Sequence, residues 1–135
     1  MKQHITPEQL QELTPEQQDR LREWWKPEKG DRFVWIPVTH INNHRSSKYS
    51  YSKRVFLFYA ASKCGEYTFL YFPGKRKENV KLRECLPILS IGQCIELLAE
   101  KDLLQLQSIF TKICLGILSV DELINVLWQA VKAVL

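Results

Sequence analysis

The sequence predicts a single α+β domain, residues 1–135, with short helices at both ends and a small antiparallel sheet of about three strands between them. Helix-start patterns, in which a hydroxyl or acidic residue is followed three positions later by glutamine or glutamate, recur at both ends. β-Branched and aromatic runs fill the middle. The content of 45% hydrophobic and 25% charged residues is ordinary for a globular protein.

The first structured segment, a helical corner over residues 6–25, repeats the letters TPEQ at Thr6 and at Thr14. In each copy threonine is a favoured N-cap, proline suits the first helical position, and glutamine completes a capping box. Proline disfavours helical geometry in the residue before it, so the first helix must end at Thr14. We therefore expect two short helices, about 7–13 and 15–25.

A pair of tryptophans, Trp24 and Trp25, closes the second helix. Adjacent helical residues point about 100° apart, so the two rings cannot face the core equally. Trp24 lies three residues after Leu21, and we expect Trp24 inside and Trp25 at a boundary. Pro27 then stops the helix.

The β-rich basic middle, residues 31–83, contains three strand-like runs. The first is RFVWIPV, Arg32–Val38. The other two, Val55–Ala61 and Glu66–Phe72, are separated by a short turn segment and predict an antiparallel hairpin. The polar stretch 39–52 and the basic stretch 73–83 are expected to be loops.

The net charge of +4 is concentrated in this middle. Residues 39–83 contain ten basic and two acidic side chains, whereas the segments before and after are net acidic. A local charge of +8 favours a polyanionic partner such as nucleic acid. The candidate polyanion-binding residues are Arg45, Lys48, Lys53, Arg54, Lys75, Arg76, Lys77 and Lys81.

The aromatic residues of the predicted hairpin have two interpretations. Phe56 and Phe58 share one strand face, and Tyr67, Phe69 and Tyr71 share another. Open faces of this kind stack bases in single-strand binders. However, both strands are apolar on both sides and helices are present to cover them, so we expect most of these rings to be buried.

Three caps divide the helical part, residues 90–135. Ser90 opens a helix to about Glu100, Asp102 opens one over 103–114, and Ser119 opens one that runs to the end of the sequence. Apolar stripes at helical spacing predict that the last two helices pack as a hairpin. The stripes are Leu103, Leu106, Phe110 and Ile113, then Val120, Leu123, Ile124, Leu127, Val131 and Val134.

This C-terminal pair is not expected to be a DNA-binding helix-turn-helix, because Asp121 and Glu122 at the start of its second helix would repel phosphates. Its apolar end has two open interpretations, a homodimer contact or docking onto the sheet. The residues concerned are Trp128, Val131, Val134 and Leu135.

No motif predicts catalysis, a cofactor or a metal. His40 and His44 have the spacing of helical zinc ligands, but their polar neighbours predict a loop and no acid or cysteine completes the set. Neither GxSxG nor a glycine-rich phosphate loop occurs. The four cysteines form no CxxC pair, and we expect them to be reduced, with Cys94 and Cys114 in helix cores.

Two segments of the chain carry a resemblance. TPEQQDRLREWWKPEKGD and CLPILSIGQCIELL, within residues 6–31 and 85–98, resemble small proteins of unknown function encoded by bacteriophages and prophages of Gram-positive bacteria. The resemblance implies a phage or prophage accessory protein in the cytoplasm of a bacterial host. It implies no active site.

We therefore expect a non-enzymatic protein that acts by binding, with nucleic acid or an acidic protein as the partner of the basic middle. The alternatives are a protein–protein adaptor or a homodimeric structural module, and an enzyme is the less favoured one. No basic-then-apolar leader opens the sequence, and no apolar run reaches the ~18 residues of a membrane span, so no membrane association is expected.

Overall fold

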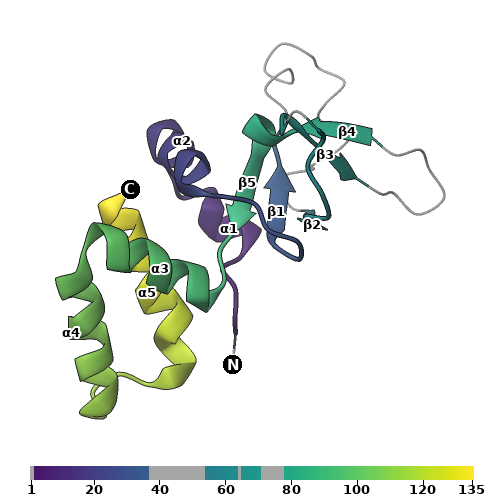
Figure 1. The fold of residues 1–135 in the computed structure, drawn as a ribbon. Helices are drawn as coiled ribbons and strands as arrows, with labels where there is room; N and C mark the ends of the chain where they lie inside the picture. Colours follow the sequence, from purple (N-terminus) through teal and green to yellow (C-terminus); the bar gives the residue numbers. More distant parts are fainter. Residues whose placement is uncertain (1, 37–53, 64, 71–77) are drawn as a thin grey trace. The chain divides into compact units, whose positions relative to one another are not determined.

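Figure 1 shows the computed structural model, which describes residues 2–36, 54–63, 65–70 and 78–135. Within these residues the chain forms five α-helices, a three-stranded antiparallel sheet and a two-stranded antiparallel sheet, so the predicted α+β class is confirmed. The chain divides into two compact units, residues 1–20 with 89–135, and residues 21–88. The expectation of a single domain stays a prediction.

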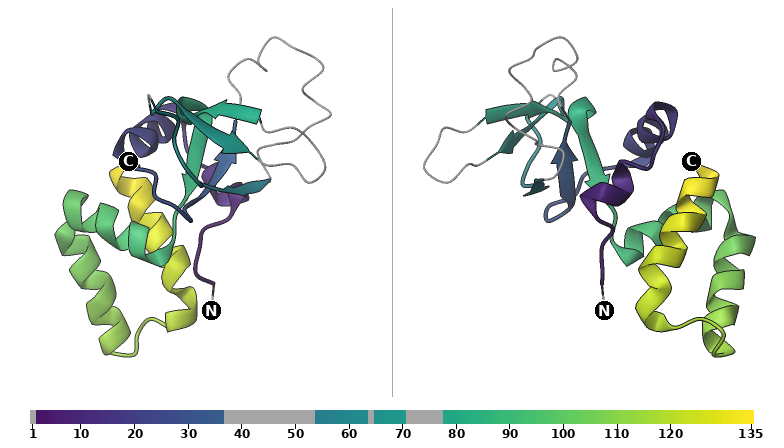
Figure 2. Two further views of the ribbon diagram at one scale, coloured as in Figure 1. Left: turned by 45° about the vertical axis from the view of Figure 1, so that its right-hand side comes forward. Right: turned by 180° about the vertical axis from the view of Figure 1, so that it is seen from behind.

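The first unit joins the two ends of the sequence. The backbone N–H of Ile5 donates to the carbonyl of Leu89 at 3.0 Å, and the N–H of Ile91 donates to the carbonyl of Gln3 at the same distance. The most extensive helix-to-helix contact is between the third and fifth helices, and the fourth packs against both (Figure 2). The helices are α1 (Pro7–Leu10), the first part of α2 (Pro15–Trp24), α3 (Ile91–Lys101), α4 (Leu103–Cys114) and α5 (Leu123–Val134).

Four of the five predicted caps are confirmed. In each, a side-chain oxygen accepts a hydrogen bond of 3.2 Å from the backbone N–H three residues later. These caps are Thr6, Thr14, Ser90 and Asp102. At Ser119 the prediction was wrong in detail, because the hydroxyl accepts from Asp121 and a 3₁₀ turn, η5 (Val120–Glu122), precedes α5.

The two TPEQ copies also fasten the N-terminal helices to α5. The side-chain oxygens of Gln9 and Gln17 each accept from the N–H of their own cap at 2.9 Å. Their amide nitrogens donate to α5, from Gln9 to the Asn125 side chain at 3.3 Å and from Gln17 to the Lys132 carbonyl at 2.9 Å. Asn125 and Lys132 are seven residues apart, about two helical turns, which matches the eight-residue spacing of the repeat.

The apolar end of α5 is internal to the first unit. Trp128, Val131 and Leu135 are buried there, so the interpretation of these residues as a homodimer contact was wrong. The predicted stripe of α5 is mostly buried, although Val120 is exposed. The predicted hairpin of α4 and α5 forms. However, α5 packs more extensively on α3 than on α4, and the apolar stripe of α5 did not predict this.

Two predictions for α4 need correction, namely its buried apolar stripe and the burial of Cys114. Leu106 is buried, but its buried neighbour is Ile109, whereas Leu103 and Phe110 are exposed. Cys114, expected in a helix core, is also exposed, because it ends the helix on its outer side; Cys94 is buried as expected. In the turn after α4, Gly116 adopts φ +74°, a left-handed conformation that glycine accommodates.

The second unit consists of the end of α2 and five strands. β1 (Arg32–Trp35) lies between β2 (Val55–Leu57) and β5 (Cys85–Ile88), and β3 (Tyr67–Leu70) pairs with β4 (Glu78–Lys81). A 3₁₀ turn, η4 (Leu82–Glu84), joins β4 to β5.

The hairpin predicted between 55–61 and 66–72 is wrong in its main pairing. β2 pairs with β1, and among the described residues one isolated bridge, from Ala61 beyond the end of β2 to Thr68 in β3, links the two runs. β3 instead pairs with β4, which lies in the stretch expected to be a loop. β5 was also not predicted. It contains Pro87, which an edge strand tolerates because the missing N–H can face away from the neighbouring strand.

The core of the second unit confirms part of the aromatic prediction. Phe56 and Phe58 are buried against Phe33 and Trp25, whereas Leu57 and Tyr59 on the alternate face are 62% and 64% exposed. We had expected helices to cover both faces of these strands. The exposure of Leu57 and Tyr59 shows that one face is not covered. Tyr67 is half-buried, and Tyr71 and the Phe69 side chain lie outside the described part.

One tryptophan of the pair is buried and the other is at a boundary, as predicted, but the assignment was wrong, because Trp25 is buried and Trp24 is half-buried. The α-helix ends at Trp24, and Trp25 lies four residues after Leu21, to whose carbonyl its N–H donates at 3.0 Å. Its indole N–H donates to the Asp31 carboxylate, also at 3.0 Å. This polar partner for the indole N–H makes burial of the Trp25 ring favourable.

Candidate polyanion interface

Two of the eight predicted polyanion-binding residues, Arg54 and Lys81, lie in the described part of the chain. Arg54 is exposed just before β2, and its guanidinium lies 5.5 Å from the centre of the Phe56 ring. Lys81 ends β4 and is half-buried. The other six, Arg45, Lys48, Lys53, Lys75, Arg76 and Lys77, lie outside the described residues.

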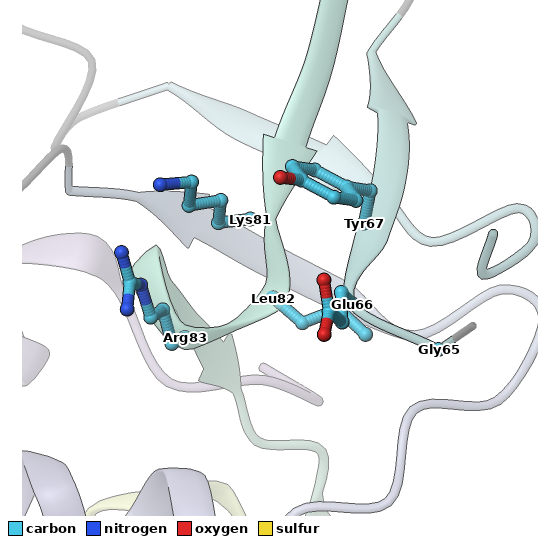
Figure 3. Close-up of a pocket in the computed structure, with 6 residues that line it drawn as sticks. All are labelled: Gly65, Glu66, Tyr67, Lys81, Leu82 and Arg83. Carbon is cyan, nitrogen blue, oxygen red and sulfur yellow. The ribbon is translucent and has the colours of Figure 1, made fainter.

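Lys81 lines a pocket that the start of β3 and the end of β4 form within the second unit (Figure 3). Its volume is about 410 Å³, within the range of small-ligand sites, roughly 300–1,000 Å³. The lining residues are Gly65, Glu66, Tyr67, Lys81, Leu82 and Arg83.

Local backbone pairing holds this pocket together. Tyr67 and Lys81 are register partners across the two strands, and the N–H of Leu82 donates to the carbonyl of Glu66 at 2.9 Å. Gly65, with φ +73°, begins the β3 side of the pocket from a conformation that few other residues adopt. The chain then leaves β4 through η4, which turns Arg83 toward the same region.

The side chains give the pocket a cationic character. In Figure 3 the Lys81 and Arg83 side chains extend to the same side, and the Tyr67 hydroxyl is directed toward that side too. Arg83 is exposed, whereas Lys81 and Tyr67 are half-buried. Ammonium, guanidinium and phenol groups are hydrogen-bond donors for phosphate or carboxylate oxygens. Glu66 opposes them, which leaves one net positive charge in the lining.

Arg83 was not among the predicted site residues. In the sequence, Arg83 ends the basic stretch that was expected to be a loop. The sequence signal that could have identified it is its position two residues after Lys81. That spacing became meaningful only with β4 and η4, because the turn brings both bases to one pocket.

Two cation–π pairs lie elsewhere in the second unit. The Lys29 ammonium is 5.1 Å from the centre of the Tyr59 ring, and Arg54 lies over Phe56. Such pairs stabilise a structure weakly at exposed sites, by about 0.5–1 kcal/mol. The Lys29 pair also keeps positive charge beside the exposed Tyr59, so this face combines apolar and cationic groups.

The described residues contain no cluster of three or more histidine, cysteine, aspartate or glutamate side chains suited to a metal ion. His40 and His44 lie outside those residues. Burial raises the pKa of the Cys94 thiol to about 12. Burial and the neighbouring Glu84 raise that of Cys85 to about 12, against a lowering by Arg22. Neither thiol is a nucleophile near neutral pH.

None of the helices in the described ranges is both long enough and apolar enough to cross a membrane. Comparison with known proteins finds no matching family model, no matching curated protein and no matching solved structure.

Proposed function

We propose that the protein is a non-enzymatic binding protein whose second unit contacts nucleic acid through its basic side chains. The observation that carries this proposal is the pocket at the β3–β4 edge, where Lys81 and Arg83 converge beside Tyr67. The residues that connect these two strands in the sequence include Lys75, Arg76 and Lys77. In the sequence they follow the end of β3 that is opposite to the pocket, so we count them as a second, separate set of candidate phosphate contacts.

The composition of the pocket favours contacts with the sugar–phosphate backbone of a nucleic acid over contacts with its bases. Its donors are long, cationic side chains with much solvent access, which is the chemistry of phosphate positioning. Tyr67 provides the one aromatic ring of the pocket, on which a base or sugar can pack. We therefore infer a weak preference for sequence and a strong dependence on salt.

The proposed setting is a phage or prophage accessory role in a bacterial cytoplasm. Its support is the resemblance of residues 6–31 and 85–98 to proteins of that origin. The neighbouring genes would test this setting directly, because phage genomes group genes of related function.

The test of nucleic-acid binding is fluorescence anisotropy with a labelled oligothymidine and a labelled duplex, each at low and high salt. We expect the affinity to fall steeply with salt, and the salt slope to decrease by roughly one for each phosphate contact removed. Two variants remove predicted contacts, the triple alanine variant of Lys75, Arg76 and Lys77 and the double variant Lys81→Ala/Arg83→Ala.

The matched control is Lys2→Ala/Lys112→Ala, which removes two exposed charges from the first unit. It loses the same net charge as the pocket double variant and should keep most of the affinity. Unchanged binding by the triple variant, or an equal loss in the control, contradicts the assignment to the second unit.

An acidic protein partner is the second candidate, and the exposed face of Leu57 and Tyr59 beside Lys29 favours it. A protein that co-purifies after nuclease treatment, and is lost with Leu57→Glu, would support this candidate over nucleic acid.

A further inference from the structure

β2 forms one edge of the three-stranded sheet, because the order β2-β1-β5 places no further strand on its outer side among the described residues (Figure 1). The backbone of Phe58, just after β2, faces inward. Its N–H donates to the Asp31 carbonyl at 2.7 Å, and its carbonyl accepts from the Gly30 N–H at 2.9 Å. Backbone groups alternate in direction along an antiparallel strand, so the N–H and carbonyl of Leu57 point to the open edge.

Apolar and cationic side chains accompany this open edge. Val55, Leu57 and Tyr59 are all exposed, and their alternate positions put them on one face of the strand. The Lys29 ammonium lies 5.1 Å from the centre of the Tyr59 ring. Arg32 is exposed and is the register partner of Leu57, so it shares the same face. We call this set the β2 edge: Lys29, Arg32, Val55, Leu57 and Tyr59.

We propose that the β2 edge binds an acidic, extended segment of another protein, which adds to the sheet as an extra strand. An unpaired strand edge offers main-chain hydrogen bonds to such a segment, and alternate side chains provide the specificity. At the β2 edge those side chains offer apolar contact, and the neighbouring cations favour carboxylates. The proposal does not depend on nucleic-acid binding, and it specifies how the second candidate, an acidic protein, would bind.

The charge around the β2 edge is positive. Residues 26–32 and 54–63 together contain five basic and two acidic side chains, a net charge of +3. One of the two acids, Asp31, is turned toward the aromatic core, where it accepts from the Trp25 indole at 3.0 Å. The other acid is Glu28, and the bases are Lys26, Lys29, Arg32, Arg54 and Lys63.

The same charge disfavours the occupants that this chain could itself supply. A second copy that pairs edge to edge would oppose Lys29 and Arg32 to their own counterparts. The stretches 37–53 and 71–77, which lie outside the described residues, each contain three basic and no acidic side chains. An acidic segment from another protein is therefore the occupant that the charges favour.

The side chains favour a peptide over nucleic acid at this edge. Sites for single strands rely on aromatic rings, on which successive bases stack. Two of the three exposed apolar side chains, Val55 and Leu57, are aliphatic, and the backbone of Leu57 offers a donor and an acceptor in the direction that an added strand requires. β2 is short, so we expect few hydrogen bonds and weak binding.

The test is an NMR titration of the full chain, labelled with ¹⁵N, with a synthetic peptide in which glutamate and valine alternate with threonine. As a strand, this peptide presents an acidic and apolar face. Binding should shift the amide signals of Val55, Leu57 and Tyr59, and should slow hydrogen exchange at the Leu57 N–H. The same peptide with its central amides N-methylated keeps its charge but loses its donors, and should bind about tenfold more weakly.

A pair of charge reversals tests the role of the cations. Lys29→Glu/Arg32→Glu should weaken peptide binding by about tenfold, because each change replaces an attraction by a repulsion. The matched control, Lys101→Glu/Lys112→Glu, reverses two exposed bases of the first unit and should keep the affinity. The pocket variant Lys81→Ala/Arg83→Ala should also keep it, which separates this result from the test of nucleic-acid binding.

Three outcomes overturn the proposal. The first is the absence of shifts in the β2 amides at millimolar peptide, and the second is an equal loss of affinity in the matched control. The third is a shift of the Leu57 signal by oligothymidine and not by the peptide, which would assign the β2 edge to nucleic acid. Equal binding of the N-methylated peptide overturns the added-strand arrangement.

Discussion

Gln17 donates a hydrogen bond from its side-chain amide to the backbone carbonyl of Lys132, 2.9 Å away and 115 residues later in the chain. Its side-chain oxygen meanwhile accepts from the N–H of Thr14 and so completes the cap of α2. Gln9 makes the corresponding pair of contacts from α1. The repeated letters TPEQ therefore start two helices and also fasten both to α5.

Replacing Gln17 by glutamate separates these two roles. The carboxylate retains the acceptor of the capping box but cannot donate to the Lys132 carbonyl, which it also repels. We expect Gln17→Glu to lower the free energy of unfolding by about 1–2 kcal/mol. Urea denaturation followed by circular dichroism measures the change.

Gln93→Glu is the control for that experiment. Gln93 is the box residue of α3, and its oxygen accepts from the Ser90 N–H at 3.0 Å, as the other box glutamines do. The described residues offer its amide nitrogen no hydrogen-bond partner. We expect its substitution to be close to neutral, and an equal loss in both variants would mean that the contact with α5 contributes nothing.

The tryptophan pair provides a second matched comparison. Trp25 packs on Phe33 and Phe58 with ring centres 6.2 and 6.3 Å apart, whereas Trp24 is half-buried at the edge of the same cluster. We expect Trp25→Ala to cost about 3–5 kcal/mol, since it empties the core of the second unit, and Trp24→Ala to cost clearly less. Urea midpoints by circular dichroism decide the order, and a larger loss for Trp24→Ala would contradict the placement of the two rings.

This pair also shows where prediction from sequence ends. Capping depends on residues three positions apart, so the caps at Thr6, Thr14, Ser90 and Asp102 could be predicted from the letters alone. The tryptophans depend on where the helix stops and on Asp31, which binds the indole from beyond the turn. A spacing rule within one helix contains neither piece of information.

Strand pairing was predicted less well for the same reason. The run Val55–Ala61 was assigned to its neighbour in sequence, but its hydrogen-bonding partner β1 lies across the long polar segment. β4 was missed because its register with β3 decides its structure, and basic residues surround it. In the candidate site, Lys81 was predicted from charge alone, whereas Arg83 required η4 to bring it to the pocket.

Asp31 is expected to be sensitive to substitution, because it accepts two hydrogen bonds within the second unit. One of its carboxylate oxygens accepts from both the Trp25 indole and the Glu28 N–H, each at 3.0 Å. Asp31→Ala removes both bonds and leaves a buried indole donor unsatisfied, so we expect a loss of about 2–3 kcal/mol. Asp31→Asn retains a carbonyl acceptor and should lose less. Equal losses in the two variants would show that the hydrogen bonds are not the cause.

Cysteine reactivity tests the burial of one thiol in each unit, Cys94 in the first and Cys85 in the second. In a Cys64→Ser background, which leaves the three cysteines of the described part, we expect iodoacetamide to modify Cys114 rapidly at mildly alkaline pH. Cys85 and Cys94 are buried and should react only after unfolding in urea. Mass spectrometry of the labelled chain gives the site. Rapid labelling of either buried thiol would contradict its placement.

The same two thiols predict a loss of stability in alkali. Burial raises the pKa of each to about 12 in the folded chain, whereas an unfolded chain releases these protons near pH 9. The folded state therefore holds more protons than the unfolded state between these values. The resulting contribution to stability is complete below pH 9 and is lost as the pH rises toward 12.

The slope is at most about 1.4 kcal/mol per pH unit for each thiol. Lysine and tyrosine side chains titrate in the same range, so the quantity to measure is the difference in unfolding free energy between the wild type and Cys85→Ala/Cys94→Ala. That difference should decrease steadily above pH 9 as the wild type loses its advantage. A difference that does not change with pH would mean that water reaches both thiols in the folded protein.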